Sequence, residues 1–159
     1  LVLTGYVDAA FANESNKRSR YGNAVYLSQC LICWLTKATS AICLSTAEAE
    51  FIAATEAAKD VIWLRNFLAE LNFPRLAPTT LYEDNQACVA MVKNHVVSAR
   101  NRHFAVKMSW LCEQVQLKLL KFVFVAGKNN IADIFTKVLP RVRHFELCSL
   151  MGIKRMIND

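Results

Sequence analysis

The stretch LSTAEAEFIAATEAAKDVIWLRNFLAEL, residues 44–71, decides the fold of this chain. Ser45 and Thr46 are favourable N-cap residues, and Glu48 follows Ser45 at the spacing of a capping box. Ala-rich helix formers continue beyond them without Gly or Pro. Apolar residues recur at a roughly helical spacing, at Phe51, Ala54, Ala58, Ile62, Phe67 and Leu71. The stretch therefore predicts one long helix with Glu50 in its first or second turn.

Segments typical of β-strands lie on both sides of this helix. Before it come short segments rich in aromatic and β-branched residues, which predict an antiparallel meander: residues 1–11, 21–28 and 31–40. After it come two more strands, residues 79–83 and 119–125, each preceded by helix. Strands joined through helices pair in parallel. Further helices are expected at residues 85–94, 100–118, 131–137 and 144–151. The sequence predicts an α/β fold in one domain, residues 1–159, with a mixed five-stranded sheet flanked by helices.

Composition narrows the functional classes. The chain has 159 residues, of which 54% are hydrophobic, as expected for a folded domain with a substantial core. No apolar run reaches the about 18 residues that a membrane span needs, and we expect no membrane partner. The formal charge of +6 favours an anionic partner such as nucleic acid. Six cysteines complete no zinc pattern and indicate reduced thiols in an intracellular protein. We expect the three tryptophans to lie in the core: Trp34, Trp63 and Trp110.

Four acids take comparable places near the ends of predicted strands or the starts of helices: Asp8, Glu50, Asp84 and Asp133. Binding sites in open sheets gather beyond strand ends. Carboxylates that converge there repel each other unless cations lie between them, and hard oxygen ligands suit Mg²⁺ or Mn²⁺. Two such ions about 3.5–4 Å apart activate a water and stabilise the leaving oxygen of a phosphodiester.

Several motifs resemble the ribonuclease H domain of copia-type LTR retrotransposon polyproteins. In chain order they are GYVDAAFAN, KRSRYGNAVYL, CLSTAEAEFIAATEAAKDVIWLR, LYEDNQAC, SARNRHFAVKMSWLCEQV and NNIADIFTKVLPR. The resemblance covers nearly the whole chain in the family's order. It implies a ribonuclease H-like fold and assigns Asp8, Glu50, Asp84 and Asp133 as the catalytic, metal-binding acids. Glu48 competes with Glu50, but the Ala-Glu-aromatic pattern favours Glu50.

The resemblance also implies an activity and partners. It implies a metal-dependent endonuclease that uses two Mg²⁺ (or Mn²⁺) ions to hydrolyse the RNA strand of RNA–DNA hybrids during reverse transcription. The chain would be a piece of a longer polyprotein, and its partner would be the reverse transcriptase domain of that polyprotein. Both would act in a cytoplasmic virus-like particle. Ala10 and Ala105 stand where the family usually has acids. An inactive nucleic-acid-binding or scaffold module of a decayed element therefore remains an alternative. A transposase or integrase core is a second one, although Glu50 on the helix after the meander favours ribonuclease H.

Polar and basic residues near these motifs are candidates for contacts with nucleic acid. Asn85 and Gln86 follow the fourth-strand acid and would reach the minor groove of a hybrid, where the 2′-hydroxyl identifies RNA. Asn85 would equally serve as a helix cap. Two basic groups would contact phosphates or form solvated surface: Lys17, Arg18 and Arg20, and then Arg100, Arg102 and Lys107. His103 would lie near phosphate or have a structural role.

Overall fold

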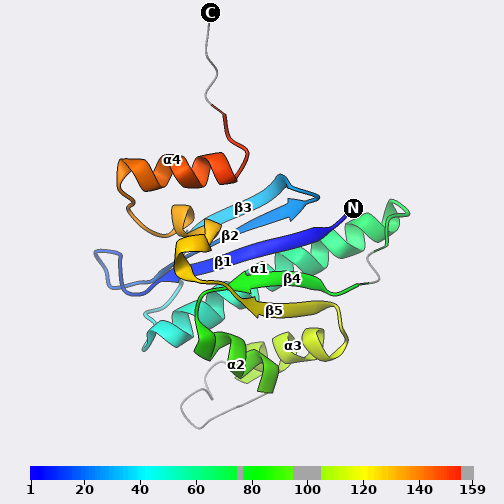
Figure 1. Ribbon diagram of the computed structural model, residues 1–159. Helices are drawn as coiled ribbons and strands as arrows, with labels where there is room; N and C mark the ends of the chain where they lie inside the picture. The colour runs from blue at the N-terminus through cyan, green and yellow to red at the C-terminus, as the bar shows by residue number, and fades with distance from the viewer. Residues whose placement is uncertain (75–76, 95–104, 155–159) are drawn as a thin grey trace, which may run out of the picture.

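A computed structural model describes residues 1–74, 77–94 and 105–154. Five strands form one sheet in the order β3-β2-β1-β4-β5 (Figure 1). They are β1 (Leu3–Ala10), β2 (Arg20–Leu27), β3 (Cys30–Ala38), β4 (Thr79–Glu83) and β5 (Leu120–Phe124). The first three strands pair antiparallel, and β4 pairs in parallel with both β1 and β5. The predicted mixed five-stranded sheet is confirmed.

The long helix α1 (Thr46–Glu70) begins where the capping residues predict. The Ser45 hydroxyl accepts a hydrogen bond of 3.1 Å from the Glu48 amide. The Glu48 carboxylate in turn accepts one of 2.7 Å from the Leu44 amide. This reciprocal arrangement satisfies backbone donors that have no partner inside the helix.

The buried face of α1 agrees with the prediction except near the C-terminal end of the helix. Phe51, Ala54 and Ala58 are buried, but Phe67 and Leu71 are 44% and 50% exposed. Continued steps of three and four residues place a different set on the core face: Val61, Leu64, Arg65 and Leu68. Ile62 is partly buried against the core. The expected apolar stripe was therefore wrong at Phe67 and Leu71, because these two residues drift off the helical repeat.

The tryptophans also differ from the prediction. Trp34 is 60% exposed on the edge strand β3, and Trp63 is 63% exposed on α1. The Trp63 ring stacks on Phe67 at the surface, with ring centroids 5.5 Å apart. Only Trp110 packs against the core, where it is partly buried. Size and hydrophobicity favour burial, but the position of a residue on its element decides it.

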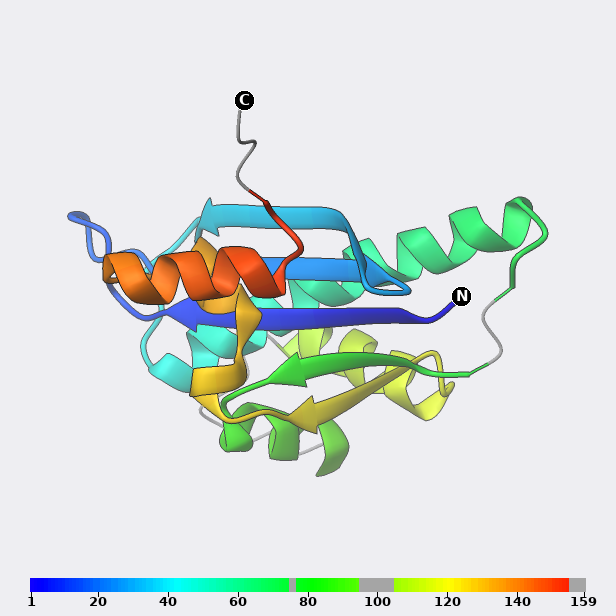
Figure 2. The same cartoon turned by 45° about the horizontal axis from the view of Figure 1, so that its top comes forward.

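Helices cover the two faces of the sheet unequally (Figure 2). One face carries α1 together with α2 (Gln86–Asn94) and α3 (Ala105–Gln116), while α4 (Arg141–Leu150) crosses the other face. Two 3₁₀ helices, η2 (Gly127–Asn129) and η3 (Ile131–Phe135), lead from β5 to α4. Val106, in the first turn of α3, is 85% exposed although it is apolar. No helix among the described residues is long and apolar enough to cross a membrane.

Candidate metal centre

Three of the four predicted acids converge at one edge of the sheet. Asp8 lies near the end of β1, Asp84 directly follows β4, and Glu50 lies in the first turns of α1. Strands β1 and β4 are parallel neighbours with Val7 opposite Glu83, so the two aspartates emerge side by side. One carboxylate oxygen from each of Asp8, Glu50 and Asp84 lies within 4.8 Å of the others. This is the only such group of potential metal ligands in the described part of the chain.

Burial makes this three-acid group electrostatically costly. Asp8 is fully buried and Glu50 is 5% exposed, and Glu50 Oε2 has no hydrogen-bond partner among the described residues. Loss of solvent raises the pKa of Glu50 to about 9, with further contributions from the charges of Asp8 and Asp84. Burial likewise raises the pKa of Asp8 and of Asp84. Three desolvated carboxylates with an unpartnered oxygen fit a hard divalent cation, which favours their ionised forms.

Asp133 lies next to this group but contacts it through a cation. It is buried in η3, whose N-cap Asn130 accepts a hydrogen bond of 3.1 Å from Ala132. Lys137 Nζ lies 2.5 Å from Asp133 Oδ1 and 3.0 Å from Asp8 Oδ1. The Thr136 hydroxyl donates a hydrogen bond to the other oxygen of Asp8. Asp133 is thus linked to Asp8 by the ammonium group of Lys137 and by the short segment that also carries Thr136.

Lys137 and Thr136 were absent from the predicted site. A signal was present, because they follow Asp133 by four and three residues, the spacing that places side chains on one face of a helical turn. Burial alone would lower the pKa of Lys137, but the charge of Asp8 and the hydrogen bonds with both acids outweigh it and raise that pKa.

Glu83 is a fifth acid that sequence reasoning missed. Its side chain is fully buried, accepts a hydrogen bond of 3.1 Å from the Asn85 amide, and has one oxygen without a partner among the described residues. Burial raises the pKa of Glu83 well above its usual value, and the charge of Glu50 adds to this. The alternation of β4 held the signal, because Thr79, Leu81 and Glu83 share the buried face.

The predicted nucleic-acid contacts have different surroundings. Asn85 Oδ1 accepts a hydrogen bond of 3.0 Å from the Cys88 amide and so caps α2, while Gln86 is exposed at the start of that helix. Arg20 forms an ion pair of 2.6 Å with Glu14. These contacts use the side-chain oxygen of Asn85 and the Nε group of Arg20. Binding of nucleic acid by these two residues stays a prediction. Three further candidates lie outside the described residues: Arg100, Arg102 and His103.

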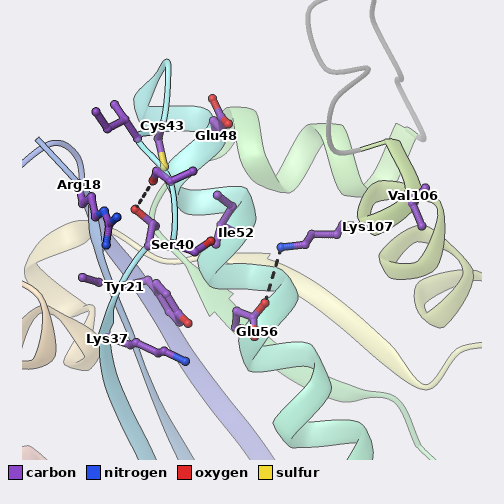
Figure 3. Close-up of a pocket in the computed structure, with 14 residues that line it drawn as sticks. Arg18, Tyr21, Lys37, Ser40, Cys43, Glu48, Ile52, Glu56, Val106 and Lys107 are labelled. Atoms are coloured by element: carbon purple, nitrogen blue, oxygen red, sulfur yellow. Dashed lines mark hydrogen bonds and ion pairs between the residues drawn. The ribbon is translucent and has the colours of Figure 1, made fainter.

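Arg18 lines an open depression on the flank of α1 (Figure 3). The depression has a volume of about 750 Å³ and lies between the first turns of α1, the start of β2, the end of β3, and the start of α3. Lys37 and Lys107 also line it, and Lys107 lies 3.9 Å from Glu56. Its α1 wall includes Ile52, two residues from Glu50. Two acids, Glu48 and Glu56, line the depression as well. Three basic and two acidic side chains thus adjoin the helix that carries Glu50.

Comparisons with known proteins give relatives along the whole chain. No family model matches it. A retrovirus-related Pol polyprotein from transposon TNT 1-94 of Nicotiana tabacum is 39% identical over 154 residues, 96% of this chain. The polyprotein from transposon RE1 of Arabidopsis thaliana is 29% identical over 157 residues, 98% of this chain. The chain spans 11% of the length of these two polyproteins.

Solved structures share the fold at low sequence identity. LC11-RNase H1 in complex with an RNA/DNA hybrid matches with a TM-score of 0.64 and 13% identity, over 84% of this chain and 93% of that one. The N-terminal ribonuclease H domain of a Mycobacterium tuberculosis protein matches with a TM-score of 0.62 and 13% identity, over 94% and 97%. Together the comparisons confirm the resemblance that the sequence motifs indicate.

Proposed function

Because this chain is a relative of one segment of retrotransposon Pol polyproteins and has the ribonuclease H fold, we propose that it is a metal-dependent endonuclease acting on RNA–DNA hybrids. It hydrolyses the RNA strand during reverse transcription. The observation that carries this proposal is the convergence of Asp8, Glu50 and Asp84, with oxygens within 4.8 Å of one another. Buried acids so close together are costly for stability, so their arrangement indicates a functional site.

The four acids would hold Mg²⁺ or Mn²⁺, two ions in all. When bound, such ions supply an activated water and stabilise the leaving oxygen of the phosphodiester. The chain itself provides rigid placement: Asp8 and Asp84 on neighbouring parallel strands, and Glu50 on a capped helix. Asp133 is fixed relative to β1 through Asn130, which donates a hydrogen bond of 2.8 Å to the Val7 carbonyl. Fixed ligands need little reorganisation when charge develops in the reaction.

The hybrid would lie across this edge of the sheet and along the basic depression of Arg18, Lys37 and Lys107. Phosphate contacts dominate the affinity of proteins for nucleic acid. The neighbour LC11-RNase H1 was solved with an RNA/DNA hybrid, which supports the same substrate class here. Since the relatives are Pol polyproteins, we propose that the domain acts beside a reverse transcriptase, in a cytoplasmic virus-like particle.

A non-catalytic nucleic-acid-binding module is the second candidate. Ala10 lies on β1 two residues after Asp8, and Ala105 begins α3, where the resembled family usually has acids. Loss of an acid at these two positions is what a decayed copy of the element would show. Neither position belongs to the three-acid group of Asp8, Glu50 and Asp84, so the candidate metal ligands themselves are retained.

Cleavage of a labelled RNA–DNA hybrid in Mg²⁺ and in Mn²⁺ tests the proposal. We expect RNA-strand cleavage that Asp84→Asn lowers by about 10²-fold or more, since a metal ligand is removed. A folded protein that binds hybrid without cleaving it in either metal would favour the binding module. Cleavage of duplex DNA in its place would favour a transposase-like core.

A further inference from the structure

The ammonium group of Lys137 lies between two of the four candidate metal ligands. Its Nζ is 3.0 Å from Asp8 Oδ1 and 2.5 Å from Asp133 Oδ1. The Thr136 hydroxyl donates to the second oxygen of Asp8. One lysine thus bridges Asp8 and Asp133 and offsets one of their two negative charges, and the residue before it along the chain fixes the orientation of Asp8.

A divalent cation cannot share that place with the ammonium. Mg²⁺ binds carboxylate oxygens at about 2.0–2.1 Å, so an ion held by the same two oxygens would overlap Nζ. The three-acid group differs in this respect. Glu50 Oε2 has no partner among the described residues and is open to a cation, with Asp84 and Asp8 beside it.

We propose that Lys137 is an internal cation that competes with a divalent ion for the position between Asp8 and Asp133. This inference rests on the proposed metal-dependent function and concerns the order in which its two metal positions fill. The first ion binds at Asp8, Glu50 and Asp84. The second binds only when the ammonium is displaced, so Lys137 is a positioning residue that sets the metal concentration needed for the second ion.

The surroundings of Lys137 permit this displacement. Its side chain is 39% exposed and follows η3, and the next residue, Val138, is fully exposed. Asp133 keeps a second cation nearby, because Arg143 Nη2 lies 4.0 Å from its Oδ2. Arg143 is itself held by the Lys128 carbonyl at 2.6 Å and by Glu146 at 2.9 Å. Departure of the ammonium therefore leaves Asp133 compensated on its other side.

Calorimetric titration of the metal-free protein with Mn²⁺ tests the inference without any substrate. We expect Lys137→Met to bind the second ion about tenfold more tightly than the wild type, as removal of a unit charge a few ångströms away implies. Lys137→Arg keeps the cation, and Lys121→Met removes an exposed lysine on β5, so both should bind like the wild type. Thermal unfolding verifies that each variant is folded.

The double variant Asp133→Asn/Lys137→Met tests whether the Lys137 ammonium competes with the second ion for the position at Asp133, or only repels an ion bound elsewhere. Competition predicts that the gain in second-ion affinity disappears, because Asp133 can no longer bind the ion. Persistence of the gain there, or an unchanged isotherm in Lys137→Met, would overturn the inference while metal-dependent cleavage by the wild type still stood. Absence of any Mn²⁺ binding to the wild type would overturn the proposed function and this inference together.

Discussion

The side-chain amide of Asn130 donates a hydrogen bond of 2.8 Å to the backbone carbonyl of Val7, and both groups are buried. Val7 directly precedes Asp8, and Asn130 caps the 3₁₀ helix that carries Asp133. This amide therefore joins the segment after β5 to the central strand, in addition to the contacts of Thr136 and Lys137 with Asp8, and helps to fix the separation of Asp8 and Asp133.

Asn130→Ala should lower both stability and cleavage. The change leaves the Val7 carbonyl and the Ala132 amide without their partners, which costs about 1–3 kcal/mol in free energy of unfolding. Urea denaturation measures this loss. Asn129→Ala is the matched control, because Asn129 is the exposed neighbour and should cost less than about 0.5 kcal/mol. Equal losses in the two variants would contradict a specific role for Asn130.

Glu50→Gln should abolish cleavage and yet stabilise the metal-free protein. The buried Glu50 carboxylate has its pKa raised to about 9 by burial and by the charges of Asp8 and Asp84. At neutral pH the variant therefore avoids a penalty on the order of 1–3 kcal/mol. Denaturation in EDTA checks the gain. Glu48→Gln keeps an acceptor for the Leu44 amide and should retain cleavage. The reverse pattern would assign the metal to Glu48.

Without divalent metal, stability should fall as the pH rises. A carboxyl whose pKa is raised on folding contributes most below its unfolded value, and that contribution is lost as the pH rises towards the folded value. For Glu50 this window runs from its usual 4.5 to about 9, and the raised pKa values of Asp8, Asp84 and Glu83 act in the same direction.

Thermal unfolding across that range in EDTA and in Mg²⁺ measures this dependence. Mg²⁺ favours the ionised carboxylates, so its stabilising effect should grow with pH. A melting temperature that rises with pH in EDTA would contradict the electrostatic account of the three-acid group.

The parts of the fold that depend on local signals could be predicted from the sequence. Ser45 and Glu48 mark the start of α1 because a cap is decided by a few neighbouring residues. The strand TTLYE was predicted to the residue, which placed Asp84 at its end. The order of strands and helices then brought Asp84 beside Asp8 through the parallel pairing of β1 and β4.

Features decided by tertiary packing could not be predicted in this way. Trp34 is 60% exposed on the edge strand β3, because the neighbouring segments cover only part of its side chain, a fact that no local pattern contains. Lys137 reaches Asp8 because the segment around η3 is held against the sheet by the hydrogen bond of Asn130 to β1 and by that of Thr36, on β3, to this segment. The sequence indicated that Asp8, Glu50 and Asp84 lie together, but it missed Glu83 and left open which cation lies between Asp8 and Asp133.

Removal of basic side chains from the depression should lower the affinity for an RNA–DNA hybrid and make that affinity less sensitive to the salt concentration. Arg18→Ala and Lys37→Ala each remove an exposed cation, so the slope of log affinity against log salt should become shallower by about one for each phosphate that the variant no longer binds. Fluorescence anisotropy in an Asp84→Asn background measures this without cleavage. Lys121→Ala, on β5, should change neither quantity. An unchanged slope for Arg18→Ala and Lys37→Ala would remove the depression from the proposed interface.

Gly22→Ala should separate the 3₁₀ helix η3 from the sheet. Gly22 lies opposite Asp8 on β2, and a Cβ there would be 2.5 Å from Phe135 Cβ and 2.9 Å from the Leu35 carbonyl. Because the carbonyl belongs to the sheet, η3 has to move, and with it Asp133 and Lys137. We expect a loss of about 1–3 kcal/mol in free energy of unfolding. We also expect cleavage to fall at temperatures where the variant remains folded.

Gly152→Ala is the control for this substitution. A Cβ at Gly152 meets no atom within 4 Å, but the residue has a φ of +78°. The positive φ alone should cost about 1–2 kcal/mol with alanine, so stability falls by a similar amount without any movement of η3. Hybrid cleavage by the two variants, compared at equal fractions folded, then tests whether the position of η3 matters. Equal activity would mean that Asp133 and Lys137 can shift without consequence, which contradicts their placement in the metal centre.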